Sequence, residues 1–293
     1  MKKSYLLLHI AVILAGFTGV FGKLISLNDG LLVWYRVFFS SILLLFLVKI
    51  FRKGNRLSLS QKIDIGKIGL LITTHWVFFY ASIRYSNISV GVICYCLTSL
   101  FTALLEPLIN KKKFSVSQLL LSLLTLIGIS LIFHLDSSFQ FGIILGVISS
   151  IFAALYTVFN ERLVKNYDSM IINYYQMIGG TIGLGGILPI YLHYVPATNI
   201  IPNSKDFLYL VLLASFCTVL LYVLFAESLK KISAFTVNLS FNLEPLYAII
   251  LAFLFFNEGK QVNFGFYIGC SFVLISVVLQ SIIASRQKHL AKK

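Results

Sequence analysis

Residues 31–51 read LLVWYRVFFSSILLLFLVKIF. Arg36 and Lys49 are the only charged side chains in this stretch. A helix of about 20 predominantly apolar residues, rising 1.5 Å per residue, crosses the roughly 30 Å hydrocarbon core of a bilayer. The stretch therefore predicts a membrane-spanning helix.

Further apolar stretches of similar length occupy most of the chain. No alternation of apolar and polar residues indicates a barrel, and backbone groups in lipid must be hydrogen-bonded within the protein. The sequence therefore predicts an all-α integral membrane protein with ten transmembrane helices. Besides 31–51, we expect spans at 5–22, 66–84, 88–110, 116–134, 141–160, 170–192, 206–229, 232–256 and 263–284.

The composition supports lipid as the main solvent of this chain. Hydrophobic residues make up 58% of it and charged residues 12%, with a mean hydropathy of +0.91, whereas soluble domains have about 25% charged residues. The net charge of +14 comes from short basic clusters beside the apolar stretches. Basic clusters beside apolar spans are typical of membrane proteins and argue against nucleic-acid binding. A nucleic-acid surface would also need a folded soluble domain, and no stretch is long enough to form one. Since no cleavage site and soluble domain follow the first apolar stretch, we expect it to be retained as a helix.

The distribution of Lys and Arg predicts the orientation. Ten spans place 19 of the 24 basic residues on the side of the N-terminus and 4 on the other side, with Arg36 inside a span. Cytosolic loops carry the excess of Lys and Arg. We therefore expect a multi-pass protein of the cell inner (plasma) membrane with both termini in the cytosol and the turn near Glu258 outside.

The two halves of the chain resemble each other in order. AGFT at 15–18 parallels ALYT at 154–157, and WYR at 34–36 parallels YYQ at 174–176. FYAS at 79–82 parallels LFAE at 224–227. The offset between the copies grows only from 139 (15 to 154) to 145 (79 to 224), as short loop insertions would produce.

Five spans in each half give the second copy the opposite polarity in the membrane. Such inverted repeats are common in secondary transporters, whose sites lie near the midplane between the repeats. We expect a first five-helix repeat at 1–135, an inverted second repeat at 141–285 and a basic cytosolic tail at 286–293. The turns after spans four and nine fit this inversion, because Lys113 is basic and predicted cytosolic, while Glu258 is acidic and predicted external.

Over nearly its whole length the chain resembles two tandem copies of the EamA-type family of the drug/metabolite transporter superfamily. The resemblance is carried by Arg36, by 99–113, by LEPL at 243–246 and by NEG at 257–259. The first copy departs from the usual pattern, with Leu100 where a proline is common and Lys113 where a glutamate is common.

The resemblance implies a carrier of a small metabolite, amino acid or drug-like solute, often an exporter. It implies alternating access around a central cavity lined by spans 1, 3, 4, 6, 8 and 9. On this basis the partners expected are a small-molecule substrate, membrane lipid and, for coupling, protons.

Ionisable residues inside a span are candidates for function, because burying charge in lipid is costly. Glu244 lies about twelve residues, roughly 18 Å of helix rise, into the ninth span. The following Pro245 lacks an N–H and frees the carbonyl of Phe241. Asn238 and Asn242 fall on one stripe of this helix, about a third of a turn from Glu244. The sequence predicts either a substrate or proton site at an opened helix, or a kinked helix in which the asparagines bond to neighbouring helices.

His75 and Trp76 lie midway along the third span, at a depth similar to that of Glu244. A lone histidine is usually a hydrogen-bonded core residue, but titration near neutral pH also makes His75 a candidate proton carrier. Arg36 lies nearer the outer face, where we expect it to lock helices together through a carboxylate or backbone carbonyls. We expect Glu106 and Glu227, close to cytosolic lysines, to form structural ion pairs.

Other candidates follow from the cavity that the resemblance implies. Tyrosine combines an apolar ring with a hydroxyl group, which suits amphipathic solutes. Aromatic candidates for the lining are Phe17, Tyr80, Tyr95, Tyr156 and Tyr222, and hydroxyl candidates are Thr18, Ser99 and Thr157.

Enzyme motifs are absent from the sequence. It contains no phosphate-binding Gly-rich loop, nucleophile elbow or metal-spaced His/Cys set, so we expect no catalytic residue, cofactor or metal. Two alternatives stay open: a flippase of lipid-linked sugars, and an intramembrane enzyme that uses His75 and Glu244 as an acid/base pair.

Overall fold

The computed structural model describes residues 2–51, 57–86, 88–132, 139–247 and 264–290, and these residues form helices without any strand. The predicted external turn near Glu258 lies outside the described residues. In chain order the elements are α1 (Lys2–Leu24), α2 (Asp29–Ile50), α3 (Leu59–Tyr85), α4 (Ile88–Asn110), α5 (Val116–Ile132), α6 (Gln140–Leu163), α7 (Ser169–Tyr194), α8 (Ser204–Ala214), the π-helix η2 (Ser215–Leu220), α9 (Leu221–Leu229), α10 (Ala234–Phe241) and α12 (Phe264–Leu290).

Polar residues fix the helix starts by accepting hydrogen bonds from the first free N–H groups. Asn28 accepts from Leu31 N at 2.9 Å before α2. Ser58 and Gln61 form a capping box before α3, which is why this helix starts seven residues before the expected span. These helices therefore begin at polar capping residues and continue through the apolar stretches.

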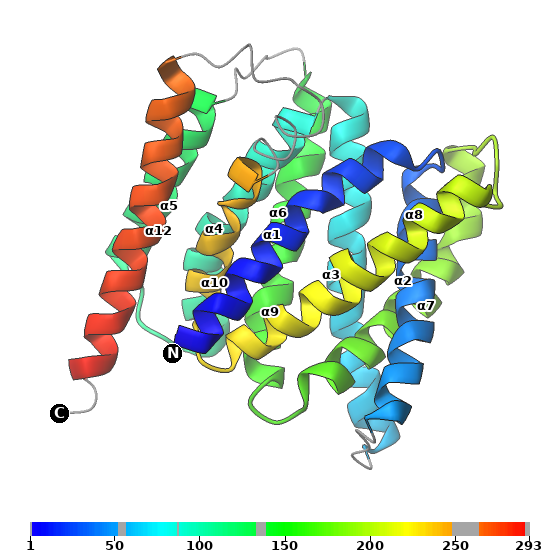
Figure 1. The fold of residues 1–293 in the computed structure, drawn as a ribbon, viewed down its shortest axis with the longest axis horizontal. Coiled ribbons are helices and arrows are strands. Elements are labelled where there is room, and N and C mark those ends of the chain that lie inside the picture. Colours follow the sequence, from blue (N-terminus) through cyan, green and yellow to red (C-terminus); the bar gives the residue numbers. More distant parts are fainter. Residues whose placement is uncertain (1, 52–56, 87, 133–138, 248–263, 291–293) are drawn as a thin grey trace.

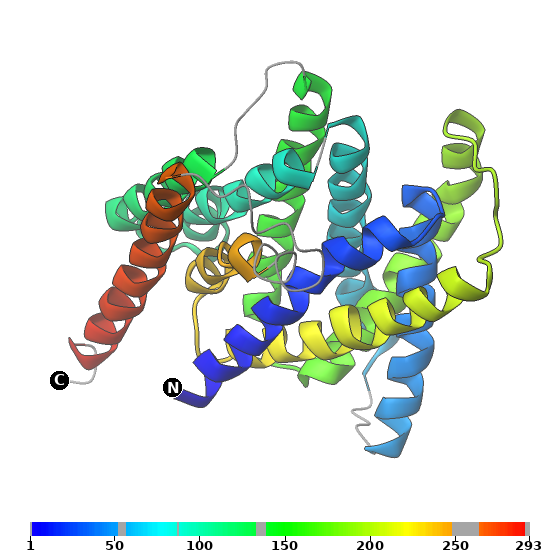
Figure 2. The same cartoon turned by 45° about the horizontal axis from the view of Figure 1, so that its top comes forward.

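The two halves of the chain interlock in one bundle (Figure 1). Helix α3 packs against α6 and α7, α2 against α7, α1 against α9, and α5 against α12. Helices α5 and α12 lie side by side at one end of the bundle, and α2 and α7 lie at the other (Figure 2). Each predicted repeat therefore buries its helices against the other one.

Glycine allows the close contact between α3 and α7. A Cβ added at Gly69 would lie 2.0 Å from the backbone oxygen of Gln176, and one at Gly179 would lie 2.2 Å from the oxygen of Gly66. Both values are far below van der Waals contact, so these glycines let the two backbones approach closely. This contact holds α3, which contributes His75 and Trp76, in place.

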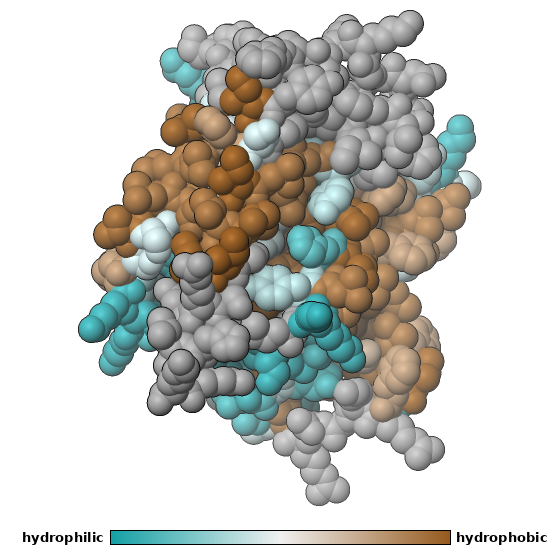
Figure 3. Space-filling model, turned by 60° about the vertical axis from the view of Figure 1, so that its left-hand side comes forward, coloured by the Kyte–Doolittle hydropathy of each residue, from teal (hydrophilic) through white to brown (hydrophobic). Residues whose placement is uncertain are grey.

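Apolar side chains cover much of the outside of the bundle. Hydrophobic residues dominate the described part of the face in Figure 3, and hydrophilic ones gather mainly toward its lower margin. Large apolar residues such as Leu59, Ile50 and Ile182 are 70–73% exposed. In the described part of the chain, Lys2–Gly22, Asp29–Ile50, Gln140–Leu163 and Ser204–Leu229 are long and apolar enough to cross a membrane. An exterior of this kind is expected where lipid is the solvent.

Two expected spans are interrupted. The eighth contains the π-helix η2 between α8 and α9. In the ninth, α10 ends at Phe241, and a turn at 242–243 comes before a further helical stretch at 244–247. The expected basic tail begins in helix, because α12 continues to Leu290.

Candidate functional site: a charged pocket inside the bundle

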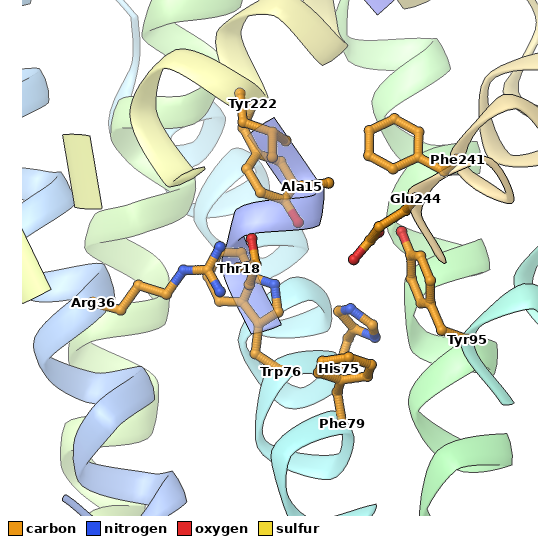
Figure 4. A pocket seen from close by; sticks show the side chains of 11 residues that line it. Ala15, Thr18, Arg36, His75, Trp76, Phe79, Tyr95, Tyr222, Phe241 and Glu244 are labelled. Atoms are coloured by element: carbon orange, nitrogen blue, oxygen red, sulfur yellow. The ribbon is translucent and has the colours of Figure 1, made fainter. Parts of the chain in front are cut away.

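A small pocket lies inside the helix bundle, with a cavity volume of about 30 Å³. Its walls come from α1, α2, α3, α4, α9, the end of α10 and the helical stretch that follows α10 (Figure 4). The pocket therefore draws on both halves of the chain. The lining residues are Ala15, Thr18, Arg36, His75, Trp76, Phe79, Tyr95, Leu221, Tyr222, Phe241 and Glu244.

Arg36 forms one charged wall of this pocket and is only 1% exposed. Its Nε donates to Thr218 Oγ1 at 2.8 Å and its Nη2 donates to the Cys217 carbonyl at 2.8 Å. Its Nη1 lies 3.4 Å from the hydroxyl of Tyr80, and its Cζ lies 3.8 Å from the centroid of the Trp76 ring. The expected helix-locking role is present through a carbonyl and hydroxyls, and the same side chain lines the pocket.

The π-helix η2 supplies the partners of Arg36. Thr218 Oγ1 accepts from Arg36 and donates to the carbonyl of Leu213, five residues earlier, at 2.9 Å. A π-helical turn widens the backbone and is found frequently at functional sites. The turn thus presents a hydroxyl and a carbonyl toward α2, and these hold a buried cation without a carboxylate.

His75 faces the pocket from α3, with one ring nitrogen held by α6. Its Nδ1 lies 3.1 Å from the Ser149 carbonyl oxygen and 2.8 Å from Ser149 Oγ. Ser149 Oγ in turn lies 3.0 Å from the His75 carbonyl oxygen, to which it donates. A carbonyl can only accept a hydrogen bond, so these contacts assign the proton to Nδ1. In the neutral ring, Nε2 is then a free acceptor.

Glu244 forms the second charged wall. It follows the turn at 242–243, where Leu243 N donates to the Ser240 carbonyl at 3.1 Å, three residues earlier. Pro245 has no N–H to bond the Phe241 carbonyl, which explains why α10 stops at this point. In Figure 4 the Glu244 carboxylate points into the pocket. Within the described residues no donor lies within hydrogen-bonding distance of this carboxylate, in contrast to the closely held Arg36.

Aromatic rings line the space between these charges. Trp76 and Tyr222 meet edge to face with their centroids 5.4 Å apart, and the rings of His75 and Tyr95 lie 5.4 Å apart. The pocket therefore has apolar walls around two charged groups. Phe79 also contacts Tyr95, at 6.0 Å. Phe79 was not predicted from the sequence, but it lies one helical turn from His75 and so shares its face of α3.

Several other predicted site residues connect α4 and α6 to α10. Asn238 Nδ2 donates to Thr102 Oγ1 at 2.7 Å, and Thr157 Oγ1 donates to Asn238 Oδ1 at 3.0 Å. Asn242 Nδ2 donates to Ser99 Oγ at 3.1 Å. Ser99, Thr157 and both asparagines therefore lie outside the pocket lining, since neighbouring helices satisfy their polar groups. We call this set of hydrogen bonds the α4–α10 polar contact.

A charged cluster continues the α4–α10 polar contact toward the end of α4. Glu106 Oε2 accepts from Phe235 N at 3.0 Å, and its Oε1 lies 2.6 Å from Lys112 Nζ. Lys112 Nζ also lies 3.0 Å from Glu161 Oε1. Glu106 thus pairs with a lysine, as the sequence predicts, and it also caps the first turn of α10.

The remaining predicted residues have structural surroundings. The Tyr80 hydroxyl contacts Arg36 from behind the lining. The Tyr156 hydroxyl donates to Gln176 Oε1 at 3.1 Å, away from the pocket. Phe17 packs against the hydrophobic core, and Glu227 pairs with Lys230 at 2.5 Å. Of the predicted substrate-binding residues, Thr18, His75, Trp76, Tyr95, Tyr222 and Glu244 line the pocket.

The described residues contain no group of three or more His, Cys, Asp or Glu side chains that could hold a metal ion. The polar chemistry of the pocket is that of one guanidinium, one carboxylate, one imidazole and several hydroxyls. Such a set can bind charged and polar groups or exchange protons.

Comparison with known proteins identifies the family of this chain. The family model described as the EamA-like transporter family matches residues 2–134 and 140–282. An uncharacterized transporter of Clostridium kluyveri is 23% identical, and the alignment covers 95% of this chain and 93% of that protein. The uncharacterized transporter YdfC of Bacillus subtilis is 26% identical, with coverages of 86% and 82%.

The fold agrees with a known structure. A crystal structure of a protein with 13% sequence identity superposes with a TM-score of 0.75 and covers 98% of this chain and 99% of the other. The two matched segments, 2–134 and 140–282, are consecutive and fill nearly the whole chain. The chain is therefore a multi-pass membrane protein that belongs to the EamA-like transporter family.

Proposed function

We propose that this protein is a secondary transporter that moves a small solute across the cell membrane by alternating access around the pocket. The observation that carries the proposal is the Glu244 carboxylate, which faces the pocket from a broken helix without a donor among the described residues. A buried carboxylate without a hydrogen-bond donor is costly inside the membrane, and a solute or proton that pairs with it offsets this cost.

The α4–α10 polar contact supports a closed state on one side. Together with the charged cluster around Glu106, it extends from the end of α4 through Asn238 to Asn242 beside the pocket. With both termini in the cytosol, this is the cytosolic side of the pocket. Rearrangement of these hydrogen bonds would open the pocket to the cytosol, and the solute would then leave on the other side, as in an exporter.

Glu244 and His75 are the groups we propose for proton coupling. They lie on opposite halves of the chain and face one pocket (Figure 4). Protonation of either would change the charge that the pocket presents to the solute. The solute, membrane lipid and protons are the proposed partners, and nucleic acid is not.

The test uses cells and then purified protein. We expect cells that produce the protein to accumulate a solute in the medium that cells without it do not, and proteoliposomes to exchange this solute unchanged. Glu244→Gln should abolish the dependence of its flux on a pH gradient, and His75→Gln should do the same. Glu227→Gln, a change at a partly exposed ion pair with Lys230, is the matched control and should behave like the wild type.

Other results would remove the proposal. A chemically altered solute would indicate an intramembrane enzyme, and movement of lipid-linked sugar between leaflets would indicate a flippase. If flux of an unchanged solute is independent of pH in the wild type, the carrier is facilitative and the coupling roles of Glu244 and His75 are wrong.

A further inference from the structure

A groove lies between α3 and α7 on the outside of the bundle, with a cavity volume of about 390 Å³. It is separate from the pocket around Arg36 and Glu244, because the two share no lining residue. The polar side chains in its lining are those of Lys62, Lys67 and Tyr175. We propose that this α3–α7 groove binds an anionic phospholipid of the cytosolic leaflet, with an acyl chain along the groove and the phosphate at Lys62.

The floor and walls of the α3–α7 groove are apolar. Gly66 and Gly179 lie in its floor, where the two backbones approach closely, and a Cβ added at Gly183 would lie 2.1 Å from a side-chain carbon of Leu70. Ile182 in the wall is 70% exposed. An acyl chain has no polar group to satisfy, so it can fill such a groove and cover its exposed apolar side chains.

Lys62 supplies a positive charge to the groove. In the described part of the chain no carboxylate lies within 4.0 Å of its Nζ, which lies 5.8 Å from the centroid of the Tyr175 ring on the facing helix. The Tyr175 hydroxyl makes no hydrogen bond to any described residue. An ammonium group and a hydroxyl can both donate hydrogen bonds to phosphate oxygens. The two helices therefore offer a phosphate one cation and one further donor.

Lys67 adds a second cation to the same groove. Its Nζ lies 3.3 Å from Asp64 Oδ1, and the two side chains are 67% and 64% exposed. Exposed ion pairs of this kind contribute little free energy, and Asp64 does not line the groove. The lining itself therefore carries only positive charge, which complements the negative charge of an anionic headgroup.

The depth of the α3–α7 groove fits one leaflet of the bilayer. Its α3 residues run from Leu59 to Leu70, roughly 16 Å of helix rise, which is about half of the hydrocarbon core. The start of α3 and the N-terminus both lie in the lower part of Figure 1, on the side that the excess of Lys and Arg predicts to be cytosolic. Anionic lipids of that leaflet attract basic side chains near the membrane surface.

The charge of the lining also argues against a second copy of this chain as the occupant. A symmetric dimer contact pairs a surface patch with itself. Such a contact through this groove would bring Lys62 and Lys67 of one copy toward the same lysines of the other. The groove therefore fits a lipid better than a dimer.

The test compares two lipids that share their acyl chains and differ in headgroup charge. Purified full-length protein in detergent is mixed with equal amounts of dioleoylphosphatidylglycerol, which is anionic, and dioleoylphosphatidylcholine, which is zwitterionic. We expect native mass spectrometry to show phosphatidylglycerol bound at least about fivefold more often than phosphatidylcholine. Glycerol 1-phosphate, which carries a phosphate without chains, should not displace it.

Lys62→Gln should remove most of the preference for phosphatidylglycerol, and Lys62→Arg should keep it, because the arginine retains the charge. The matched control is Lys49→Gln, which removes an exposed lysine in the last turn of α2, outside the groove. It should bind both lipids like the wild type, so it separates a local site from a general effect of net charge.

The apolar part of the site is tested on α7. Ile182→Ser puts a hydroxyl into the wall of the groove and should weaken binding of both lipids. Ile187→Ser changes a residue of α7 that is 59% exposed and lies outside the lining, so it should leave lipid binding unchanged.

Three results would overturn the lipid site. The first is equal binding of the two lipids by the wild type, and the second is equal loss of phosphatidylglycerol in Lys62→Gln and Lys49→Gln. The third is a dimer that Ile182→Ser dissociates while lipid binding persists, because the groove would then be a contact between copies. Lipid binding is measured without any transported solute, so none of these results depends on the proposed transport function.

Discussion

The guanidinium of Arg36 lies over the indole ring of Trp76, with Cζ 3.8 Å from the ring centroid. The ring faces one side of the cation, while Thr218 and the Cys217 carbonyl accept two of its N–H groups at 2.8 Å. This arrangement uses the planar shape of arginine as well as its charge.

Arg36→Lys should therefore destabilise the protein although it keeps the charge. A lysine ammonium cannot donate to both partners from the positions of Nε and Nη2, and an unsatisfied buried group costs about 1–3 kcal/mol. We expect a lower midpoint of thermal unfolding in detergent. Arg84→Lys is the control, because Arg84 is partly exposed and makes a single ion pair with Asp29 at 3.2 Å. Equal midpoints for the two variants would refute the role given to the guanidinium.

Gly69→Ala should force α3 and α7 apart. The new Cβ would lie 2.0 Å from the backbone oxygen of Gln176, and overpacking typically costs about 1–3 kcal/mol. We expect a lower yield of monodisperse protein and a lower unfolding midpoint. Nothing lies within 4 Å of a Cβ added at Gly186, in the same bundle, so Gly186→Ala should be neutral or slightly stabilising. Wild-type stability of Gly69→Ala would show that the two helices can separate at little cost.

Asn238→Ala should weaken closure of the pocket on the α10 side. The change removes the hydrogen bonds to Thr102 and Thr157. A cysteine placed at buried Ser99 in a cysteine-free background should then react faster with a thiol reagent added from the cytosolic side. Ser41→Ala, which removes a bond within α2, should leave the rate unchanged. The same rate in both variants would show that Asn238 does not hold this side closed.

Lys112 should stabilise the protein independently of pH up to alkaline conditions. Partial burial lowers its pKa, but the hydrogen bond and charge of Glu106 and the charge of Glu161 outweigh burial and raise the pKa above 10.5. A raised pKa gives stabilisation that is complete below the unfolded-state value and is lost as pH rises through the folded-state value. Lys112→Gln should therefore lower the unfolding midpoint equally at about pH 7 and pH 9. Lys113→Gln changes an exposed neighbour and is the control. A smaller loss in the unfolding midpoint of Lys112→Gln at about pH 9 than at about pH 7 would contradict the pairing of Lys112 with the two glutamates.

Single cysteines should report the membrane orientation. In a cysteine-free background, position 165 should be protected from an impermeant thiol reagent in intact cells, and position 199 should be labelled. The reason is the excess of Lys and Arg on the side of the termini. Opening the cells with detergent should make both positions reactive, which controls for buried cysteines. Labelling of position 165 with protection of position 199 would reverse the orientation.

The sequence alone was sufficient for the class of fold and for part of the pocket. Hydropathy and helix rise define the spans, because lipid leaves the backbone little choice but helix. Hydropathy also singles out Glu244 and His75. Placing an ionisable group inside an apolar span costs free energy whichever way the helix is rotated. Trp76 was predicted from its depth in the third span, and Tyr222 from the cavity that the family resemblance implies.

Only the tertiary structure separates the polar residues that bond to neighbouring helices from those that face the pocket. Asn238, Asn242 and Tyr156 lie at suitable depths, yet their side chains bond to Thr102, Ser99 and Gln176. Depth follows from the position in the sequence, but the direction of a side chain depends on how each helix is rotated against the next.

The hydrogen-bond partners of Arg36 also could not be predicted from the sequence. The sequence shows a cation inside a span, but its partners are 181 and 182 positions away and depend on a π-helical turn in α8–α9 that hydropathy does not reveal. What the sequence determines is the cost of placing a charge in lipid, because that cost is local. What the tertiary structure decides is which distant groups offset the cost, because that depends on packing between helices.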